Sequence, residues 1–341
     1  RVHESAAVWT IYHAIDSETA NPFQAYQATR YVDTAIPHIP VTAHGLKENG
    51  YATIATTNWL PYSWSINNVA FAEVMHTALS YFQAGRADAG YKLLKSSVLD
   101  GMYLGDSPGN FGQISFYDAA RGECYRDFGD PIGVASRVLI QGLFGILPDA
   151  LNKQIILRPG FPADWDKASV STPDISYRFT RKEDTDTYHI TQRFQTPLHP
   201  VLQINARKEK IRSVKVNDVP ATWQSIESAH GYPLLSIQAE GTSSTTITIE
   251  WEGAPLHTLA VQEPVITSNG KLALQIPSGA SISQVYDPQS VLAKHTMGAT
   301  AFNAQIKGEP GHHTFFVYTH QGEMDWWQPV NIYIENTRKA P

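Results

Sequence analysis

The sequence predicts a mixed α+β protein of several domains, with a helical part followed by antiparallel β-sandwich modules. Up to about residue 150, apolar side chains recur at helical spacing between long loops. From about residue 154 onwards, short apolar segments are separated by turn residues at fairly even intervals, which is typical of β-sandwiches. The chain has 341 residues, of which 42% are hydrophobic, and this is enough for two or three packed domains.

Four helices are expected in the first part of the chain. Asn21 is a good N-cap and Pro22 suits the first helical position, and Pro131 can begin the last helix in the same way. The two central helices are separated by a very short turn at Gly85, so we expect an antiparallel helical hairpin. Loops as long as those between the helices are usually functional. The helices are predicted over about residues 22–32, 65–83, 87–102 and 131–148, and the long loops over 34–62 and 104–130.

The second part of the chain is expected to form two sets of strands, of which the second and smaller set follows Pro255. A hairpin is predicted over residues 214–220, with Asn217 and Asp218 at its tip. Neighbouring residues of a strand point to opposite faces, so one of Trp326 and Trp327 is expected in the core and the other at a contact between domains. The predicted strands cover about residues 154–157, 174–180, 187–195, 201–206, 211–216, 234–239, 245–251, 264–267, 271–276, 281–286, 301–306, 314–319 and 330–334.

Composition excludes several classes of function. The formal net charge is −6 and no basic patch dominates, which argues against nucleic acid as the main partner. Cys124 is the only cysteine, so neither an internal disulfide nor a cysteine-based metal site is expected. No stretch of about 18 apolar residues predicts a membrane span. Glu73 and His76 lie one helical turn apart and could hold a metal, but no second such pair exists, so we predict a buried polar pair and neither metal nor cofactor.

Several stretches resemble known carbohydrate-active proteins. The junction D-F-G-D-P-I-G-V-A-S-R-V-L-I-Q-G-L-F-G-I-L-P-D over 127–149, followed by Q-I-I-L-R-P-G-F-P over 154–162, resembles the six-hairpin glycosidases. The runs T-I-Y-H-A-I-D-S-E, N-W-L-P-Y-S-W-S-I-N-N and A-R-G-E-C-Y-R-D-F, which begin at residues 10, 58 and 120, are similar to Bacteroidetes proteins that carry domain of unknown function 4450.

The resemblance implies a domain organisation. Residues 1–153 would be the C-terminal part of an (α/α)6 toroid, residues 154–254 a β-sandwich, and residues 255–341 a second, small, Ig-like sandwich. Twelve helices with their loops need roughly 200 residues, more than the helical part has. We therefore expect the remaining hairpins to come from a segment N-terminal to Arg1, acting as a partner within the same protein. The resemblance also implies a periplasmic or cell-surface location in a Gram-negative bacterium.

The resemblance directs the search for catalytic residues to carboxylates in loops, because glycoside hydrolysis generally needs two carboxyl groups that flank the scissile bond. The loop 104–130 is rich in arginine, tyrosine and acidic residues, and an N-terminal loop carries Asp16, which could face Glu123. Two structural alternatives stay open: Glu123 in a buried ion-pair network, and Asp130 as an ordinary helix cap. The predicted catalytic residues are Glu123, Asp16, Asp127 and Asp130.

Side chains that suit sugar hydroxyls and ring faces lie in the same loops. Asparagine amides bind hydroxyl groups and aromatic rings stack on sugar faces, while Arg121 could pair with the carboxylate of a uronic acid. His13 could equally be a structural histidine and Trp59 a core residue. The predicted substrate-binding residues are Asn58, Trp59, Tyr62, Asn68, Tyr117, Arg121, Tyr125, His13 and Glu18.

These features lead to a glycoside hydrolase that works without metal or cofactor as the leading hypothesis. A polysaccharide lyase is the first alternative, in which a tyrosine or histidine removes the proton next to a uronate carboxylate. A non-catalytic glycan-binding protein is the second alternative. The density of loop carboxylates favours the hydrolase. The lyase would use Tyr117, Tyr125, His13, Asn58 and Arg121.

Overall fold

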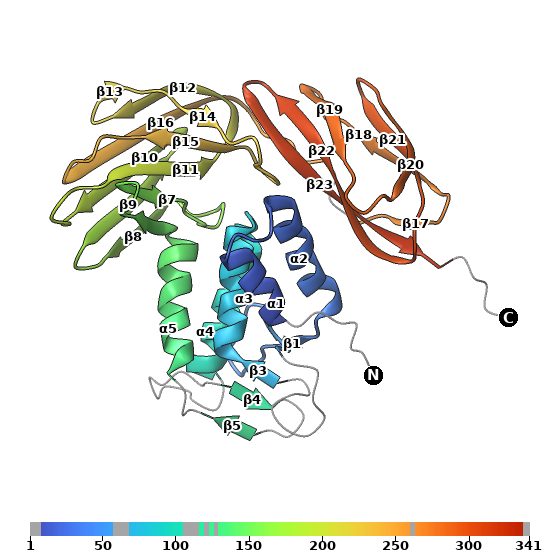
Figure 1. Cartoon of the computed structure of the whole chain (residues 1–341), viewed down its shortest axis with the longest axis horizontal. Helices are drawn as coiled ribbons and strands as arrows, with labels where there is room; N and C mark the ends of the chain where they lie inside the picture. The colour runs from blue at the N-terminus through green and yellow to red at the C-terminus, as the bar shows by residue number, and fades with distance from the viewer. Residues whose placement is uncertain are drawn as a thin grey trace. The chain divides into compact units, whose positions relative to one another are not determined.

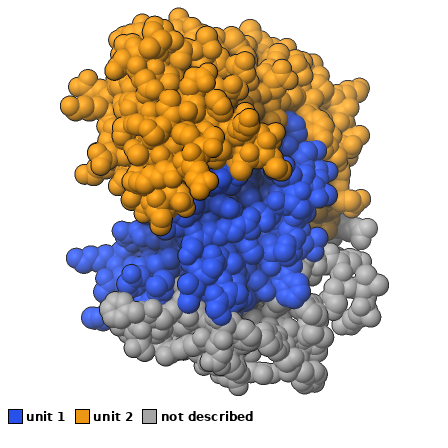
Figure 2. All heavy atoms as spheres, turned by 60° about the vertical axis from the view of Figure 1, so that its left-hand side comes forward, with its two compact units in different colours: residues 1–148, 156–165 blue, residues 149–155, 166–341 orange. Residues whose placement is uncertain are grey.

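A computed structural model describes residues 8–56, 68–104, 116–118, 123–125, 129–259 and 263–336. The chain divides into two units (Figure 2): Arg1–Pro148 with Ile156–Trp165 form unit 1, and Asp149–Ile155 with Asp166–Pro341 form unit 2. The described helices lie in unit 1, and the large sheets are formed by later strands (Figure 1). The mixed α+β class is therefore confirmed. A toroid is not confirmed, since the described part contains five α-helices, and the domain limits at 153/154 and 254/255 stay predictions.

Helix α3 is the centre of unit 1 and contacts α1, α2, α4 and α5 (Figure 1). Its side chains are buried on nearly all sides, Phe71, Val74 and Met75 completely, as expected for a helix that is apolar all round. No described helix is long and apolar enough to cross a membrane. The helices are α1 (Val8–Asp16), α2 (Pro22–Ala35), α3 (Phe71–Gln83), α4 (Ala87–Val98) and α5 (Asp130–Arg137), with π-helical segments η1 (Leu99–Leu104) and η2 (Val138–Leu143).

The predicted helix signals at α2 and at the α3–α4 turn are confirmed. Asn21 and Gln24 form a reciprocal capping box, in which each side-chain oxygen accepts the other residue's N–H at 2.9 and 3.0 Å. Gly85 ends α3 with a φ of 70°, and the N–H of Arg86 returns to the carbonyl of Tyr81 at 2.8 Å. This is the left-handed stop expected of a glycine at that position.

Several predictions about helices need correction. The helix predicted over 65–83 begins at Phe71, and residues 68–70 form a short strand instead. The segment around residues 10–18 was expected to be a loop, but it forms helix α1. Val8, Ile11, Tyr12 and Ile15 are buried at helical spacing, a pattern that was readable in the sequence. The helices predicted over 87–102 and 131–148 are α-helical only in their first parts and continue as η1 and η2.

The strands between residues 146 and 255 form two sheets that each bury one face. A six-stranded sheet has the order β13-β12-β16-β10-β9-β8, and a five-stranded sheet has the order β14-β15-β11-β7-β6. Residues alternate between buried and exposed along β9 and β10, as expected for a β-sandwich. The strands are β6 (Ile146–Asp149), β7 (Gln154–Leu157), β8 (Lys167–Ser171), β9 (Ile175–Lys182), β10 (Thr185–Gln192), β11 (His199–Asn205), β12 (Lys208–Val216), β13 (Val219–Pro220), β14 (Gln224–Ser225), β15 (Leu234–Gln238) and β16 (Ser244–Pro255).

The rest of unit 2 forms two further sheets around a core of its own. Their orders are β17-β23-β22-β19 and β18-β21-β20, and all these strands pair antiparallel except β17 with β23. The core includes the fully buried Phe302, Phe315 and Ile332. The strands are β17 (Val265–Thr267), β18 (Lys271–Gln275), β19 (Ala280–Tyr286), β20 (Leu292–Met297), β21 (Ala301–Ile306), β22 (Gly311–Gln321) and β23 (Met324–Glu335).

In unit 2 the predicted hairpin and the predicted burial of one of the two neighbouring tryptophans are confirmed. Asn217 and Asp218 have φ values of 49° and 65° between β12 and β13, as a tight two-residue hairpin turn requires. Trp326 is buried in the core, whereas a contact between domains stays a prediction for Trp327. Its N–H donates to the carbonyl of Ala229 at 2.8 Å, and the N–H of Gly231 donates to the carbonyl of Trp327 at 2.9 Å.

Candidate active site

A cluster of polar side chains lies where helices α1, α3 and α5 come together. Both α1 and α5 pack against α3, so the polar residues of α3 that face them are drawn into a largely apolar environment. We call this group the α1–α3–α5 cluster. It consists of Tyr12, His13 and Asp16 from α1, Glu73, His76 and Gln83 from α3, and Asp130 and Arg137 from α5.

Glu73 has the most perturbed carboxyl group of the cluster. Its Oε2 atom is buried and has no hydrogen-bond partner among the described residues. Desolvation raises the pKa of Glu73 from 4.5 to about 7; hydrogen bonds from the side chains of Trp9 and Thr56 oppose this rise, and the charge of Asp130 adds to it. The carboxyl group therefore holds its proton over much of the range in which an ordinary glutamate is ionised.

Asp130 supplies a second carboxyl group close enough to act on the first electrostatically. It is the first residue of α5 and is exposed. Partial desolvation raises the pKa of Asp130, while its own backbone N–H lowers it. The charge of Asp130 raises the pKa values of both Glu73 and Tyr12. The cluster thus contains two coupled carboxyl groups, one more buried than the other.

Asp16 is held by two neighbours. Its two oxygens accept hydrogen bonds from Nη1 and Nη2 of Arg137 at 2.9 and 2.6 Å, and Gln83 donates to Oδ1 at 2.9 Å. Burial alone would raise the pKa of Asp16, but these hydrogen bonds and the guanidinium charge outweigh it and lower the pKa. A bidentate pair of this kind fixes the orientation of both side chains.

The rings of the cluster complete its polar surface. Those of His13 and His76 lie 4.6 and 4.7 Å from the ring of Tyr12, centroid to centroid. Burial and the neighbouring Arg137 lower the pKa of His76, whose Nε2 lies 3.3 Å from Nη1 of Arg137. Because a guanidinium can only donate, Nε2 is the acceptor. Burial, together with the charges of Glu73 and Asp130, raises the pKa of Tyr12 to about 12, so the phenol keeps its proton.

The predicted loop residues converge on a small sheet beside α3. β3 (Asn68–Ala70), β4 (Phe116–Asp118) and β5 (Glu123–Tyr125) form a three-stranded sheet, and β3 leads directly into α3. Asn68 is in register with Asp118, which is in register with Glu123. Two loops that are distant in the sequence therefore meet. The backbones of Asn68, Tyr117, Glu123 and Tyr125 are placed in this sheet, whereas Asn58, Trp59, Tyr62, Arg121 and Asp127 lie outside the described residues.

Other predicted residues have different surroundings. Glu18 follows α1 with a φ of 57°, and its charge acts on the guanidinium of Arg158, whose pKa is lowered by burial and raised by Glu18. The loop 34–62 contains the paired strands β1 (His38–Pro40) and β2 (Ala52–Ile54). Among the residues that the structure describes, no group of three histidine, cysteine or acidic side chains could hold a metal ion.

Five residues of the cluster were not predicted as part of an active site: Tyr12, Glu73, His76, Gln83 and Arg137. Glu73 is the one acidic residue in the thirteen-residue apolar sequence of α3. Most side chains of α3 are buried, so its one carboxyl group is largely desolvated, and desolvation raises the pKa of a carboxyl group. The apolar neighbours of Glu73 are visible in the sequence, but the hypothesis that catalytic carboxylates lie in loops excluded this residue.

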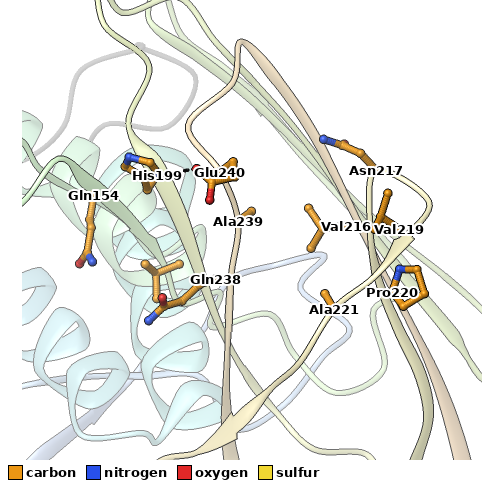
Figure 3. Close-up of a pocket in the computed structure, with 11 residues that line it drawn as sticks. Gln154, His199, Val216, Asn217, Val219, Pro220, Ala221, Gln238, Ala239 and Glu240 are labelled. Carbon is orange, nitrogen blue, oxygen red and sulfur yellow. Dashed lines mark ion pairs between the residues drawn. The ribbon is translucent and has the colours of Figure 1, made fainter.

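A groove in unit 2 contains a histidine and a carboxylate and can be compared with the cluster. It has a volume of about 460 Å³, and Figure 3 shows His199 and Glu240 on one side and Val216, Val219 and Pro220 on the other. Glu240 is the one carboxylate in its lining, and His199 Nδ1 lies 3.6 Å from Glu240 Oε2. This groove has no second carboxyl group, so it does not offer the pair that glycoside hydrolysis needs.

Comparison with known proteins yields distant structural similarities. No family model and no curated protein matches the sequence. An alpha-L-rhamnosidase from Dictyoglumus thermophilum is similar over 54% of this chain and 21% of its own, with 14% identity and a TM-score of 0.37. The tandem Ig repeats of Dlar are similar over 45% of this chain and 90% of their own, with 9% identity and a TM-score of 0.17. Similarities this distant do not decide the function, which rests on the side chains of the α1–α3–α5 cluster.

Proposed function

We propose that this chain carries active-site residues of a glycoside hydrolase, with Glu73 as the proton donor. The observation that carries the proposal is the carboxyl group of Glu73, whose Oε2 is buried and unpartnered among the described residues and whose pKa is raised to about 7. A general acid for glycosidic cleavage has to be protonated near neutral pH, and a carboxyl group acquires this property by burial. Glu73 would protonate the glycosidic oxygen as the bond to the sugar breaks.

The second carboxyl group of the proposed reaction is Asp130 or Glu123. Asp130 is exposed and coupled to Glu73 through its charge. Glu123 stands in β5, which is tied to α3 through β4 and β3. An ionised carboxylate at either position would activate water or attack the anomeric carbon. Asp127 stays a further candidate, and Asp16 supports the site by holding Arg137.

Neighbouring side chains suit the recognition of a sugar. The Tyr12 phenol is a permanent hydrogen-bond donor at working pH, and the indole of Trp9 is 40% exposed, so part of its ring can stack on a sugar face. Asn58, Trp59, Tyr62 and Arg121 remain proposed binding residues on the adjoining loops. No metal or organic cofactor enters this reaction, because both proton transfer and nucleophilic attack are performed by carboxyl groups.

A helical partner segment belongs to the proposal. Ile132 and Leu139 are 60% and 41% exposed at helical spacing on α5 and η2. Large apolar side chains that stay exposed on a helical segment are typical of a segment that packs against a partner. We expect an N-terminal segment of the same protein to cover this face, as a toroid would require. A periplasmic or cell-surface location is part of the same proposal and rests on the resemblance of the sequence.

The proposal is tested by an activity screen on plant and host glycans that follows reducing ends and ultraviolet absorbance together. New reducing ends without absorbance would support a hydrolase. Glu73→Gln should then lower kcat at least a thousandfold, while Glu48→Gln, at an exposed carboxylate of the same unit that pairs with Lys95 at 2.9 Å, should change it less than twofold. Rising absorbance would indicate an unsaturated uronate product and hence a lyase. Full activity of the Glu73→Gln variant would refute the assignment of the proton donor.

A further inference from the structure

Three adjoining rows on the outer face of strands β8, β9, β10 and β16 carry only hydroxyl and basic side chains, and the next row of the same face contains Lys182, Thr185 and Glu250. The strand register aligns twelve outward residues in three rows across the sheet. Nine of them bear hydroxyl groups and three are basic, with no carboxylate and no apolar side chain among them. We call this surface the hydroxyl face. Its rows are Lys167, Thr180, Thr187 and Thr248, then Ser169, Arg178, His189 and Thr246, then Ser171, Ser176, Thr191 and Ser244.

The hydroxyl face is positively charged, whereas the whole chain has a negative net charge. The whole sequence has 32 acidic against 26 basic residues, so an average exposed surface of this protein would contain more carboxylates than cations. The alternate residues of β9 and β10, such as Tyr177, Phe179 and Ile190, are buried in the core. The sheet therefore presents a flat positive surface supported by a rigid core, with neighbouring side chains of a row about 5 Å apart.

Two arginines mark the part of the face that is suited to a ligand. Arg193, just beyond β10, donates from Nη2 to Ser176 Oγ at 3.0 Å, which holds its guanidinium beside the face. Arg178 stands exposed in the middle row and makes no hydrogen bond or ion pair within the described part of the chain. A hollow of about 440 Å³ is lined by both arginines, His189, four serine or threonine residues of the face and the neighbouring Val170 and Tyr177. A guanidinium with five free donors is well matched to a planar carboxylate or to a sulfate.

We propose that the hydroxyl face binds an anionic polysaccharide, whose carboxylate or sulfate groups pair with Arg178 and Arg193 while its hydroxyl groups bond to the serines and threonines. The inference rests on the proposed function for the choice of a glycan. It deepens that function by naming the charge of the polysaccharide that the enzyme binds. Hydroxyl side chains both donate and accept, so they match sugar hydroxyls in any orientation. Steering by the two cations would raise the local concentration of substrate.

Two other occupants fit the surface less well. A neutral polysaccharide is bound chiefly by ring stacking, and Tyr177, the aromatic residue in the lining of the hollow, has its ring buried. Nucleic acid requires many phosphate contacts and is disfavoured by the net charge of −6. The face is also far too rich in hydroxyl groups to serve as an apolar docking surface.

The test measures binding of the whole chain to immobilised polygalacturonate, dextran sulfate, neutral dextran and duplex DNA at low and physiological salt. A Glu73→Gln background prevents turnover. The double variant R178Q/R193Q should bind the preferred anionic polymer at least tenfold more weakly, and Arg178→Gln alone, which breaks no contact within the described part, about threefold. The control R212Q/K271Q removes the same charge from other exposed positions and should stay within twofold. Dextran should not bind.

The outcomes separate this inference from the proposed function. Equal binding by R178Q/R193Q and its parent, an equal loss in R212Q/K271Q, or tighter binding to duplex DNA than to either polymer would each overturn the inference. Preference between polygalacturonate and dextran sulfate identifies the anionic group. Binding that depends on Arg178 in a protein without hydrolytic activity would support the inference and count against the proposed function. Hydrolysis by the parent protein together with unchanged binding in R178Q/R193Q would support the proposed function and count against the inference.

Discussion

At the scale of single residues, the environment of Glu73 controls its proton. The carboxyl group lies on a helix whose other faces are packed, and its pKa is raised from 4.5 to about 7 by desolvation first. An enzyme that needs this group protonated should lose kcat/KM as the pH rises through about 7. The free energy of unfolding should depend on pH in the same window, because the unfolded chain ionises Glu73 at a lower pH than the folded chain does.

The pH dependence of the free energy of unfolding tests the raised pKa of Glu73. Between pH 4.5 and about 7 the folded state binds the proton of Glu73 and the unfolded state does not, so stability falls as the pH rises. The rise in pKa corresponds to about 3 kcal/mol. Since glutamine cannot ionise, Glu73→Gln should gain up to that amount relative to the parent between pH 4 and pH 8, measured by urea denaturation. Glu48→Gln should differ from the parent by a nearly constant amount above pH 4.5, because hydrogen bonds from Tyr51 and Lys95 lower the pKa of Glu48 and the group is ionised in both the folded and the unfolded chain over that range. A pH-independent difference for Glu73→Gln would contradict the raised pKa.

Only some residues of the candidate site could be predicted from the sequence. Residues were chosen by their presence in polar loops, which led to Glu123 and Asp130 but passed over Glu73. The position of His76 one helical turn from Glu73 is visible in the sequence. The surroundings of these two residues, however, include the pair formed by Arg137 and Asp16, which are 121 residues apart in the chain and 2.6 Å apart in space. Local patterns carry no information about such a contact, because it is created by the packing of α1 and α5 on α3.

At the scale of elements, the end of the helical unit depends on one glycine. Gly145 follows η2 with a φ of 65°, and the N–H of Arg158 donates to its carbonyl at 2.8 Å. A Cβ atom at this position would lie 1.8 Å from the carbonyl oxygen of Arg158. Neither the backbone conformation nor the available space accepts a side chain, so this chain reversal between helix and sheet requires glycine.

Substitution of two glycines separates this requirement from helix propensity. Gly145→Ala should lower the free energy of unfolding by about 3 kcal/mol or more, since it adds backbone strain to a collision with backbone atoms. Gly133→Ala, inside α5 where a Cβ meets nothing within 4 Å, should be neutral or stabilise by up to about 1 kcal/mol. Both values follow from chemical denaturation with circular dichroism. A mild effect of Gly145→Ala would mean that the loop can adopt another conformation.

The elements themselves were largely predictable from the sequence. Strand periodicity placed β7 at residues 154–157 and β21 at residues 301–306 with the limits that the structure has. Helix caps placed the start of α2, because Asn21 and Pro22 act locally. The prediction failed at η1 and η2, where the widened turns of a π-helix follow from tertiary packing: a Cβ on Gly142 in η2 would lie 2.6 Å from the ring of Phe82. Periodicity alone cannot distinguish such a segment from an α-helix.

At the scale of the whole molecule, each unit has buried interactions of its own. Unit 2 contains Asp186, which is 1% exposed and accepts hydrogen bonds from Arg181, Arg207 and the indole of Trp251 at 3.0, 2.9 and 3.1 Å. These four side chains come from separate strands and a turn of the six-stranded sheet. A buried carboxylate with three donors stabilises the fold only while all four side chains are present. When the carboxylate is removed, the two guanidinium groups lose their counter-charge.

Removal of this charge tests whether the units unfold separately. Asp186→Asn should destabilise unit 2 by about 3 kcal/mol, whereas Asp184→Asn, which breaks an exposed pair with Lys208, should leave its stability nearly unchanged. Because each unit encloses its own core, we expect differential scanning calorimetry to resolve two transitions. Asp186→Asn should lower the midpoint of one, and Gly145→Ala that of the other. A single transition shifted by both substitutions would show that the units fold as one cooperative body. Separate transitions would mean that catalysis by the α1–α3–α5 cluster and binding by the hydroxyl face can be lost independently, so that activity and glycan binding should disappear at different temperatures.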